Sequence, residues 1–199
     1  MAERGSWPHH LGVTDTSDWR TRRWEATHRR IYATALALFE DFGYEQVSVS
    51  QIAKRADVSV PTFYAHYPSK EHIVMAPPTV DEVGALLATQ PDGLLVGERV
   101  LQANLRWIAL MPAHEYDELL ARWRIIAATP TLRTRVAEFE RATAGMILQN
   151  LPSPPDTAQV VRATAALAAT TAALLAWADG DGERPLQALF DETFRALSG

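Results

Sequence analysis

Apolar residues recur three and four positions apart along most of this 199-residue chain, and no segment alternates apolar and polar residues as an exposed β-strand does. Clusters of proline and glycine separate the apolar stripes. The pattern therefore predicts an all-α fold. In the second part of the chain, the predicted helices span 79–90, 94–111, 113–129, 131–151, 156–178 and 185–197.

An earlier helix is predicted from about Trp24 to Phe42, where a single apolar stripe follows the helical period. Gly43 comes next and supplies the left-handed residue that often ends a helix. The stripe, which we expect to face a core, consists of Ile31, Ala35, Leu38, Phe39 and Phe42.

Two short helices joined by a tight turn are predicted after Gly43. Ser48 and Gln51 form a capping box, which places the start of the first short helix at Ser48. Asp57-Val58 makes the turn, and Ser59 caps the second short helix. The residues expected to face inward are Val49, Ile52, Ala53 and Ala56 on the first helix, and Phe63 and Tyr67 on the second.

The outer rim of the second short helix is small and rich in hydrogen-bonding groups, as a helix entering a DNA major groove would be. Its apolar members suit thymine methyl groups, and its polar members suit phosphates or base edges. Helix-turn-helix pairs also occur in helical proteins that do not bind DNA, so the pattern alone leaves both interpretations open. The rim consists of Val60, Pro61, Thr62, Tyr64, Ala65 and His66.

Residues 43–71 carry the string GYxxxSVxxIAxxAxVSxxTFYxHYxSKE. This string closely resembles the N-terminal domain of the tetracycline-repressor (TetR) family of bacterial regulators, and the resemblance covers about residues 24–75. It implies a three-helix DNA-binding domain followed by a helical domain for effector binding and dimerisation. It also implies DNA contacts, mostly to phosphates, by Thr62, Tyr64, His66 and Lys70.

The resemblance further implies that the tip formed by Val60, Pro61 and Thr62 contacts the bases. Ser48 is another phosphate candidate, although its capping role alone explains it. Asp57 and Pro61 stand where many family members carry glycine, and these departures bear on which bases are recognised.

Three regions are predicted: a disordered tail over 1–18, a DNA-binding domain over 19–75, and an effector-binding and dimerisation domain over 76–199. The net charge is −5, but residues 19–75 hold 8 Lys and Arg against 6 Asp and Glu, whereas 76–199 hold 10 against 15. Positive charge is thus biased toward the predicted DNA-binding domain. Arginines between Trp19 and Arg23, together with Arg29-Arg30, either contact DNA as a flexible arm or form a solvated helix start.

Enzymatic and metal-dependent functions find no support in the sequence. There is no cysteine, which excludes disulfides, thiolate catalysis and zinc-finger sites. His114 and Glu118 have metal-ligand spacing, but no second histidine completes a site. The sequence therefore predicts no enzyme, no metal and no cofactor.

A soluble, cytoplasmic protein is expected because no signal peptide is evident. The alanine-rich run near 163–178 is interrupted by threonines, which favours a packed helix over a membrane span. We expect no membrane association.

The last two helices form the predicted homodimer interface, because they carry broad faces of apolar and small residues. The alternative is that these faces pack only within one subunit. A two-fold dimer implies a palindromic operator. The predicted interface contains Val160, Val161, Thr164, Leu167, Thr171, Leu174, Leu175, Leu186, Leu189, Phe190, Phe194 and Leu197.

The middle helices hold the predicted effector pocket, which would suit a flat or hydrophobic small molecule. Arg122, Arg124 and His114 are candidates for an acidic group on that molecule. The segments 124–133 and 177–180 resemble an actinobacterial subgroup of the family, some of whose members respond to acyl-CoA or fatty-acyl compounds. The alternative for each candidate is a place in the packed core, which is the commoner role of such residues. The candidate lining residues are Asn104, Trp107, Met111, Trp123, Phe139, Thr143, Met146 and Trp177.

These observations predict a homodimeric repressor that a small hydrophobic effector releases from its operator by shifting the helix between Ser69 and Pro77-Pro78. Two alternatives remain open. One is a regulator of the same fold that answers a protein partner or no effector. The other is a helical binding module that no longer binds DNA.

Overall fold

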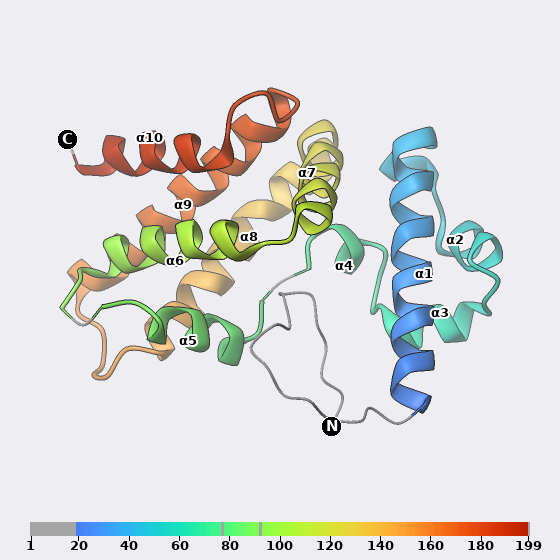
Figure 1. Cartoon of the computed structure of the whole chain (residues 1–199), viewed down its shortest axis with the longest axis horizontal. Helices are drawn as coiled ribbons and strands as arrows, with labels where there is room; N and C mark the ends of the chain where they lie inside the picture. Colours follow the sequence, from blue (N-terminus) through green and yellow to red (C-terminus); the bar gives the residue numbers. More distant parts are fainter. Residues whose placement is uncertain (1–18, 77, 92, 199) are drawn as a thin grey trace. The chain divides into compact units, whose positions relative to one another are not determined.

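The computed structural model describes residues 19–76, 78–91 and 93–198, and every regular element in those ranges is a helix (Figure 1). The all-α fold predicted from the sequence is therefore confirmed. The tail predicted over residues 1–18 lies outside the described residues. The chain divides into two compact units between residues 76 and 77. We refer to them as the N-terminal unit and the C-terminal unit.

The N-terminal unit begins with a long helix on which the shorter helices pack. This helix starts at Trp19, earlier than predicted, so the arginines at 20, 22 and 23 belong to its first turns and do not form a flexible arm. The elements are α1 (Trp19–Phe42), the 3-10 helix η1 (Tyr44–Gln46), α2 (Val49–Arg55), α3 (Val60–His66) and α4 (Glu71–Val74).

The buried face of α1 differs from the predicted stripe at its C-terminal end. Ile31, Ala35 and Phe39 are buried as expected. Phe42, however, is 63% exposed, because it is the last residue of α1 and no other element of the unit covers it. Leu36 is buried instead, which shows that the apolar face of α1 is broader than the predicted stripe.

The turn between α2 and α3 is built by hydrogen bonds that the local sequence specifies. Ser48 and Gln51 form the predicted capping box at the start of α2. At the other end Asp57 adopts a left-handed φ of 53°. Its N–H donates to the carbonyl of Lys54, and the N–H of Val58 donates to the carbonyl of Ala53. This is the Schellman arrangement that ends many helices, and it directs the chain into α3.

The C-terminal unit contains six helices whose bounds lie close to the predicted ones. The proline and glycine clusters separate them as expected, and Pro130 itself begins α8, where its missing N–H costs no hydrogen bond. The elements are α5 (Val80–Ala88), α6 (Val96–Leu110), α7 (Ala113–Ala128), α8 (Pro130–Gln149), α9 (Thr157–Asp179) and α10 (Leu186–Ser198).

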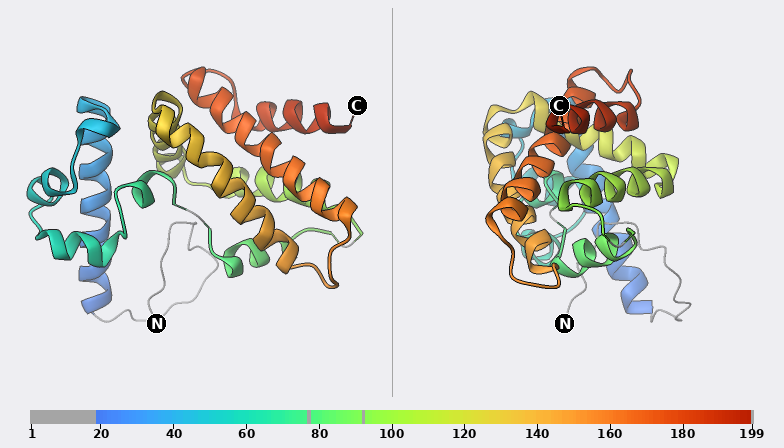
Figure 2. Two further views of the ribbon diagram at one scale, coloured as in Figure 1. Left: turned by 180° about the vertical axis from the view of Figure 1, so that it is seen from behind. Right: turned by 90° about the vertical axis from the view of Figure 1, so that its left-hand side faces the viewer.

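Helix α9 is the central element of this unit and packs against α6, α7, α8 and α10 (Figure 2). Its alanines let neighbouring helices approach closely, and Ala163, Ala166 and Ala173 are fully buried. Among the described helices it is the one long and apolar enough to cross a membrane by length and composition. Within its own unit, α9 packs against four other helices.

Half of the residues predicted for the dimer interface are buried within the subunit. Leu186, Leu189, Phe190 and Phe194 of α10 are buried in the core of their own unit, as are Thr171 and Leu174 of α9. Helix α10 folds back on α9, and the four buried apolar residues of α10 face the core of the unit. Val161 and Leu197 stay exposed, at 60% and 51%, so dimerisation remains a prediction for the outer faces of these helices.

Candidate nucleic-acid interface

Helix α3 separates an inward face from an outward face as predicted. Phe63 is fully buried and Tyr67 is nearly so, which anchors the helix to the unit. The adjacent Tyr64 is 52% exposed, and its ring meets Phe63 edge-on with 5.5 Å between centroids. Pro61 is exposed and Val60 half-exposed at the start of the helix. An apolar tip and a free phenol thus lie on one side of α3.

The start of α3 is held by a serine and threonine pair. The Thr62 N–H donates to Ser59 Oγ at 3.1 Å, and the two hydroxyl oxygens lie 2.7 Å apart. Thr62 remains half-exposed. Its hydroxyl can accept or donate one further hydrogen bond from a position that the cap fixes.

His66 does not lie on the exposed rim, and this part of the prediction is wrong. The side chain is 8% exposed, and its ring lies 4.8 Å from Trp24 and 5.7 Å from His28, centroid to centroid. Trp24 and His28 of α1 cover the end of α3, a tertiary contact that the helical period of α3 alone does not reveal. Burial, and then the positive charge of Arg30, lowers the pKa of His66.

Lys70 and Ser48 both have structural tasks. The Lys70 ammonium donates to the carbonyl oxygens of Tyr44 at 2.7 Å and Val47 at 3.0 Å, and lies 4.2 Å from the centre of the Tyr44 ring. Burial lowers the pKa of Lys70, while nearby Glu45 raises it. The Ser48 hydroxyl is shared with the backbone and side chain of Gln51. Any DNA contact by either residue uses only its remaining hydrogen-bonding capacity.

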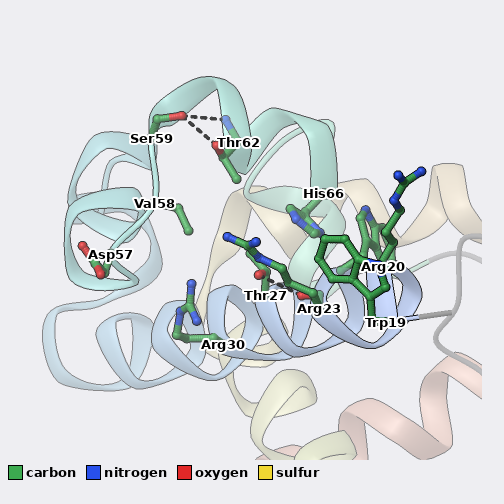
Figure 3. A pocket seen from close by; sticks show the side chains of 11 residues that line it. Trp19, Arg20, Arg23, Thr27, Arg30, Asp57, Val58, Ser59, Thr62 and His66 are labelled. Carbon is green, nitrogen blue, oxygen red and sulfur yellow. Dashed lines mark hydrogen bonds between the residues drawn. The ribbon is translucent and has the colours of Figure 1, made fainter.

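A groove of about 610 Å³ lies between the first turns of α1 and the turn that leads into α3 (Figure 3). The sequence predicts the arginine cluster but not the groove, because the predicted first helix begins near Trp24. Once α1 starts at Trp19, Arg20, Arg23, Thr27 and Arg30 share one face of a helix. The residues lining this α1–α3 groove are Trp19, Arg20, Arg23, Trp24, Thr27, Arg30, Asp57, Val58, Ser59, Thr62 and His66.

Arg30 connects α1 to the helix-turn-helix turn. Its Nε donates to the carbonyl oxygen of Ala56, the C-cap of α2, at 2.8 Å. The bond satisfies a carbonyl at the end of α2 and fixes the guanidinium beside the turn. Positive charge is thereby held in the α1–α3 groove by the fold itself.

A stack of rings supports the groove from beneath. His28 lies between Trp24 and Tyr67, with ring centroids 4.8 Å and 4.2 Å away, and both contacts are stacked. The Nδ1 atoms of His28 and His66 are buried and have no hydrogen-bond partner among the described residues. Burial, and then the charge of His66, lowers the pKa of His28 to about 4. Both imidazoles are therefore neutral near pH 7.

Two of the predicted effector-binding residues belong to the interior of the C-terminal unit. Asn104 Nδ2 donates to Thr170 Oγ1 at 2.8 Å, which links α6 to α9. Trp177 is 1% exposed, and its ring meets Tyr116 at 4.8 Å. Their contacts serve the packing of the unit, and their place in a pocket stays a prediction.

The other candidates are less buried. Trp107, Met111, Trp123 and Met146 pack against the same core as Trp177, partly exposed. Phe139 and Thr143 lie half-buried on α8, outside that core.

The charged candidates for an acidic effector group fall into different surroundings. Arg124 pairs with Asp181 at 2.6 Å, so its charge is already balanced. His114 is exposed at the start of α7. Arg122 Nε is buried and has no hydrogen-bond partner among the described residues. Of the three, Arg122 is the one whose buried donor is still available.

The chain matches two family descriptions, one in each unit. Residues 31–76 match "Bacterial regulatory proteins, tetR family", and residues 96–199 match "MftR C-terminal domain". The second match covers more than half of the chain. The protein belongs to the TetR family of bacterial regulatory proteins.

Relatives of known name are transcriptional regulators. The HTH-type transcriptional regulator TcmR of Streptomyces glaucescens is 37% identical over 138 residues, which are 64% of this chain and 58% of TcmR. The HTH-type transcriptional repressor KstR of Rhodococcus jostii is 44% identical over 48 residues, covering 24% of this chain and 23% of KstR. The chain thus matches little more than half the length of TcmR and much less of KstR.

Solved structures of TetR-family regulators are also similar to this chain. One is a tetR-family transcriptional regulator from Streptomyces coelicolor, which is 20% identical, with 87% of this chain and 79% of that chain covered and a TM-score of 0.49.

Proposed function

We propose that the protein is a sequence-specific DNA-binding repressor that acts in the cytoplasm as a homodimer on a palindromic operator. Helix α3 enters the major groove, where Val60, Pro61 and Thr62 meet base edges. Tyr64 contacts a phosphate. Ser48 and Lys70 are secondary phosphate contacts, limited by the internal hydrogen bonds they already make.

The outward face of α3 is the observation that carries this proposal. Its exposed residues follow directly on buried anchors, so the helix is held rigidly while Tyr64 and Pro61 project from the unit. The Schellman turn and the Ser59 cap fix the angle at which α3 leaves α2. Recognition helices of this kind contact bases with their N-terminal residues, which is where the apolar tip lies.

Fluorescence titration of DNA from the protein's own upstream region tests this function. We expect tight binding that unlabelled scrambled DNA does not displace and that weakens steeply with salt. Tyr64→Phe should lower the affinity for all DNA sequences alike, whereas Val60→Ala should alter which sequence is preferred. Binding indifferent to sequence at every promoter tried would instead favour a helical module that has lost its DNA function.

The C-terminal unit is proposed to bind a small hydrophobic effector, with fatty-acyl and acyl-CoA compounds as the first class to try. Partly exposed Trp107, Met111, Trp123 and Met146 line the core at a place where a ligand could bury further apolar surface. The available donor of Arg122 suits an acidic group on such a molecule. Effector binding would release DNA by favouring a state in which the two α3 helices no longer match successive major grooves.

Thermal unfolding with a chain-length series of acyl-CoA esters, free fatty acids and free CoA tests the effector class. A true effector raises the melting temperature and releases the operator duplex at the same concentration, because the coupling between the two ligands is reciprocal. Arg122→Gln should lower the affinity for an acidic effector, and Arg124→Gln serves as the control. Equal effector affinity of free and DNA-bound protein would favour regulation by a protein partner or by no effector.

A further inference from the structure

We propose that the α1–α3 groove binds one backbone phosphate of the DNA, with Arg20 and Arg23 as the contacting side chains. This inference rests on the proposed function and extends it to a second element, because α1 then contacts the DNA together with α3. It assigns the first turns of α1, which precede the family match beginning at residue 31, a specific role.

The α1 wall of the groove presents cations at helical spacing. Arg20, Arg23 and Arg30 lie at positions i, i+3 and i+10 of one helix, so their side chains project from one face. Figure 3 shows them along α1, facing Ser59, Thr62 and His66 across the groove. The cations therefore line a concave surface.

Arg20 and Arg23 present exposed positive charge to the groove. Neither forms an ion pair with a carboxylate in the part of the chain that the structure describes, and both are exposed. Arg20 lies 5.8 Å from the centre of the Trp19 ring, a contact that leaves its five N–H donors available. Among the described residues, Asp57 is the one carboxylate that lines the groove, and Figure 3 shows it at the opposite end from Arg20.

Arg30 is a positioning residue in this account. Because its Nε donates to the Ala56 carbonyl, its guanidinium holds α1 against the turn and keeps the groove walls at a fixed separation. The stacked rings of Trp24 and His28, with the tilted ring of His66 against both, support the groove. The two imidazoles are neutral near pH 7. An anion in the groove thus meets positive charge on a rigid support.

A DNA phosphate is the occupant that the position favours. Thr62 belongs both to the groove wall and to the tip of α3 that is proposed to contact bases. A strand whose bases meet this tip must carry its sugar-phosphate backbone past the same residue. Guanidinium groups bind phosphate oxygens through paired, charge-assisted hydrogen bonds, and three arginines outweigh one aspartate here.

The chain offers a matched control for a charge-neutralising experiment. Arg22 is exposed on α1 next to Arg23, but it does not line the groove. Arg23→Gln and Arg22→Gln therefore remove the same charge from the same helix, inside and outside the groove. Titrations would use a fluorescent duplex selected by the unaltered protein from a random-sequence pool, and an unrelated duplex at low salt.

Arg23→Gln should lower the affinity for both duplexes roughly ten-fold, which is the contribution of one charge-assisted hydrogen bond. It should also reduce the slope of log affinity against log salt by about 0.9, as for one lost phosphate contact. Arg22→Gln should weaken binding by no more than about two-fold, because its charge acts only through screened solvent. Equal losses in the two variants would overturn the groove as a phosphate site.

Neutral methylphosphonates placed one at a time along the selected duplex distinguish a DNA phosphate from a free ion. At one phosphate in each half-site, the methylphosphonate should lower the DNA affinity of the unaltered protein roughly ten-fold. It should not lower the affinity of the Arg23→Gln variant any further, because both changes remove the same contact. If the methylphosphonate and Arg23→Gln lower the affinity additively at every phosphate, the inference is overturned while the proposed function stays intact. Failure of the unaltered protein to select any duplex would overturn both.

Discussion

The N-terminal unit and the C-terminal unit are both all-helical, but their functional surfaces are determined by different interactions. In the N-terminal unit, side chains donate to backbone carbonyls at the ends of short helices, as Arg30 does to Ala56 and Lys70 does to Tyr44. In the C-terminal unit, long helices meet through alanine-rich and aromatic packing around α9. The surface of the N-terminal unit is therefore determined by individual hydrogen bonds at helix ends, and that of the C-terminal unit by how large side chains pack between helices.

The largest expected effect comes from neighbouring aromatic residues of α3. Phe63→Ala should destabilise the N-terminal unit by about 3–5 kcal/mol, because the ring is fully buried. Tyr64→Ala should change stability by less than about 1 kcal/mol, since its ring is half-exposed, yet it should abolish tight DNA binding. Urea unfolding and DNA titration of both variants measure the two effects. Similar unfolding free energies would contradict the assignment of an anchoring face and a DNA face.

His28 and His66 should make the N-terminal unit the more acid-sensitive of the two. Because the pKa of His28 is lowered from 6.5 to about 4 in the folded protein, the unfolded chain binds more protons between these values. Stability is therefore greatest above about pH 6.5 and falls as the pH drops toward 4, by roughly 2 kcal/mol once partial exposure of the ring is considered. The lowered pKa of His66 acts in the same direction.

Unfolding monitored at about pH 7.5 and about pH 5 measures this loss. His28→Phe keeps a stacking ring and should remove most of the pH dependence. An unchanged dependence in the variant would assign the acid sensitivity to other groups.

A smaller effect is expected from Arg30→Gln. The substitution removes the hydrogen bond to the Ala56 carbonyl and should destabilise the N-terminal unit by about 1–2 kcal/mol. Arg29→Gln, which neutralises an exposed neighbour, should leave stability unchanged. Amide hydrogen exchange of α2 and α3 would show the difference as faster exchange in the first variant only. Equal exchange in both would mean that the turn does not depend on this bond.

The smallest effect is expected at the surface of the C-terminal unit. Arg124 and Asp181 form an ion pair at 2.6 Å, but their side chains are 43% and 78% exposed. Arg124→Gln should therefore cost less than about 1 kcal/mol. Differential scanning calorimetry measures this loss, and a value above about 2 kcal/mol would mean that the ion pair between α7 and the turn after α9 contributes more to stability than an exposed pair should.

The fold could be predicted from the sequence wherever one residue decides a boundary. Ser48, Ser59 and the proline clusters mark helix ends through local hydrogen bonding or its absence, and the structure has helix boundaries at or near them. Trp19 carries no such signal, so the early start of α1 was missed. The α1–α3 groove was missed with it, since Trp19, Arg20 and Arg23 line that groove. The burial of His66 was missed for another reason, because the sequence does not show that Trp24 and His28 contact the end of α3.

The faces of the C-terminal helices were harder to predict for a different reason. Helices α9 and α10 carry apolar residues broadly, so their sequences do not distinguish contact with their own subunit from contact with a second copy. Phe190 and Phe194 are buried within their own subunit. Asn104 similarly looks like a ligand-binding amide until Thr170 is found 2.8 Å away on a helix distant in sequence.

Selection of duplexes from a random-sequence pool, followed by sequencing, tests most directly whether α3 recognises DNA. The proposed function predicts enrichment of one inverted-repeat sequence by the unaltered protein, a shifted preference with Val60→Ala, and no enrichment with Tyr64→Ala. If the unaltered, folded protein enriches no sequence at low salt, then α3 does not recognise DNA and the central claim is contradicted.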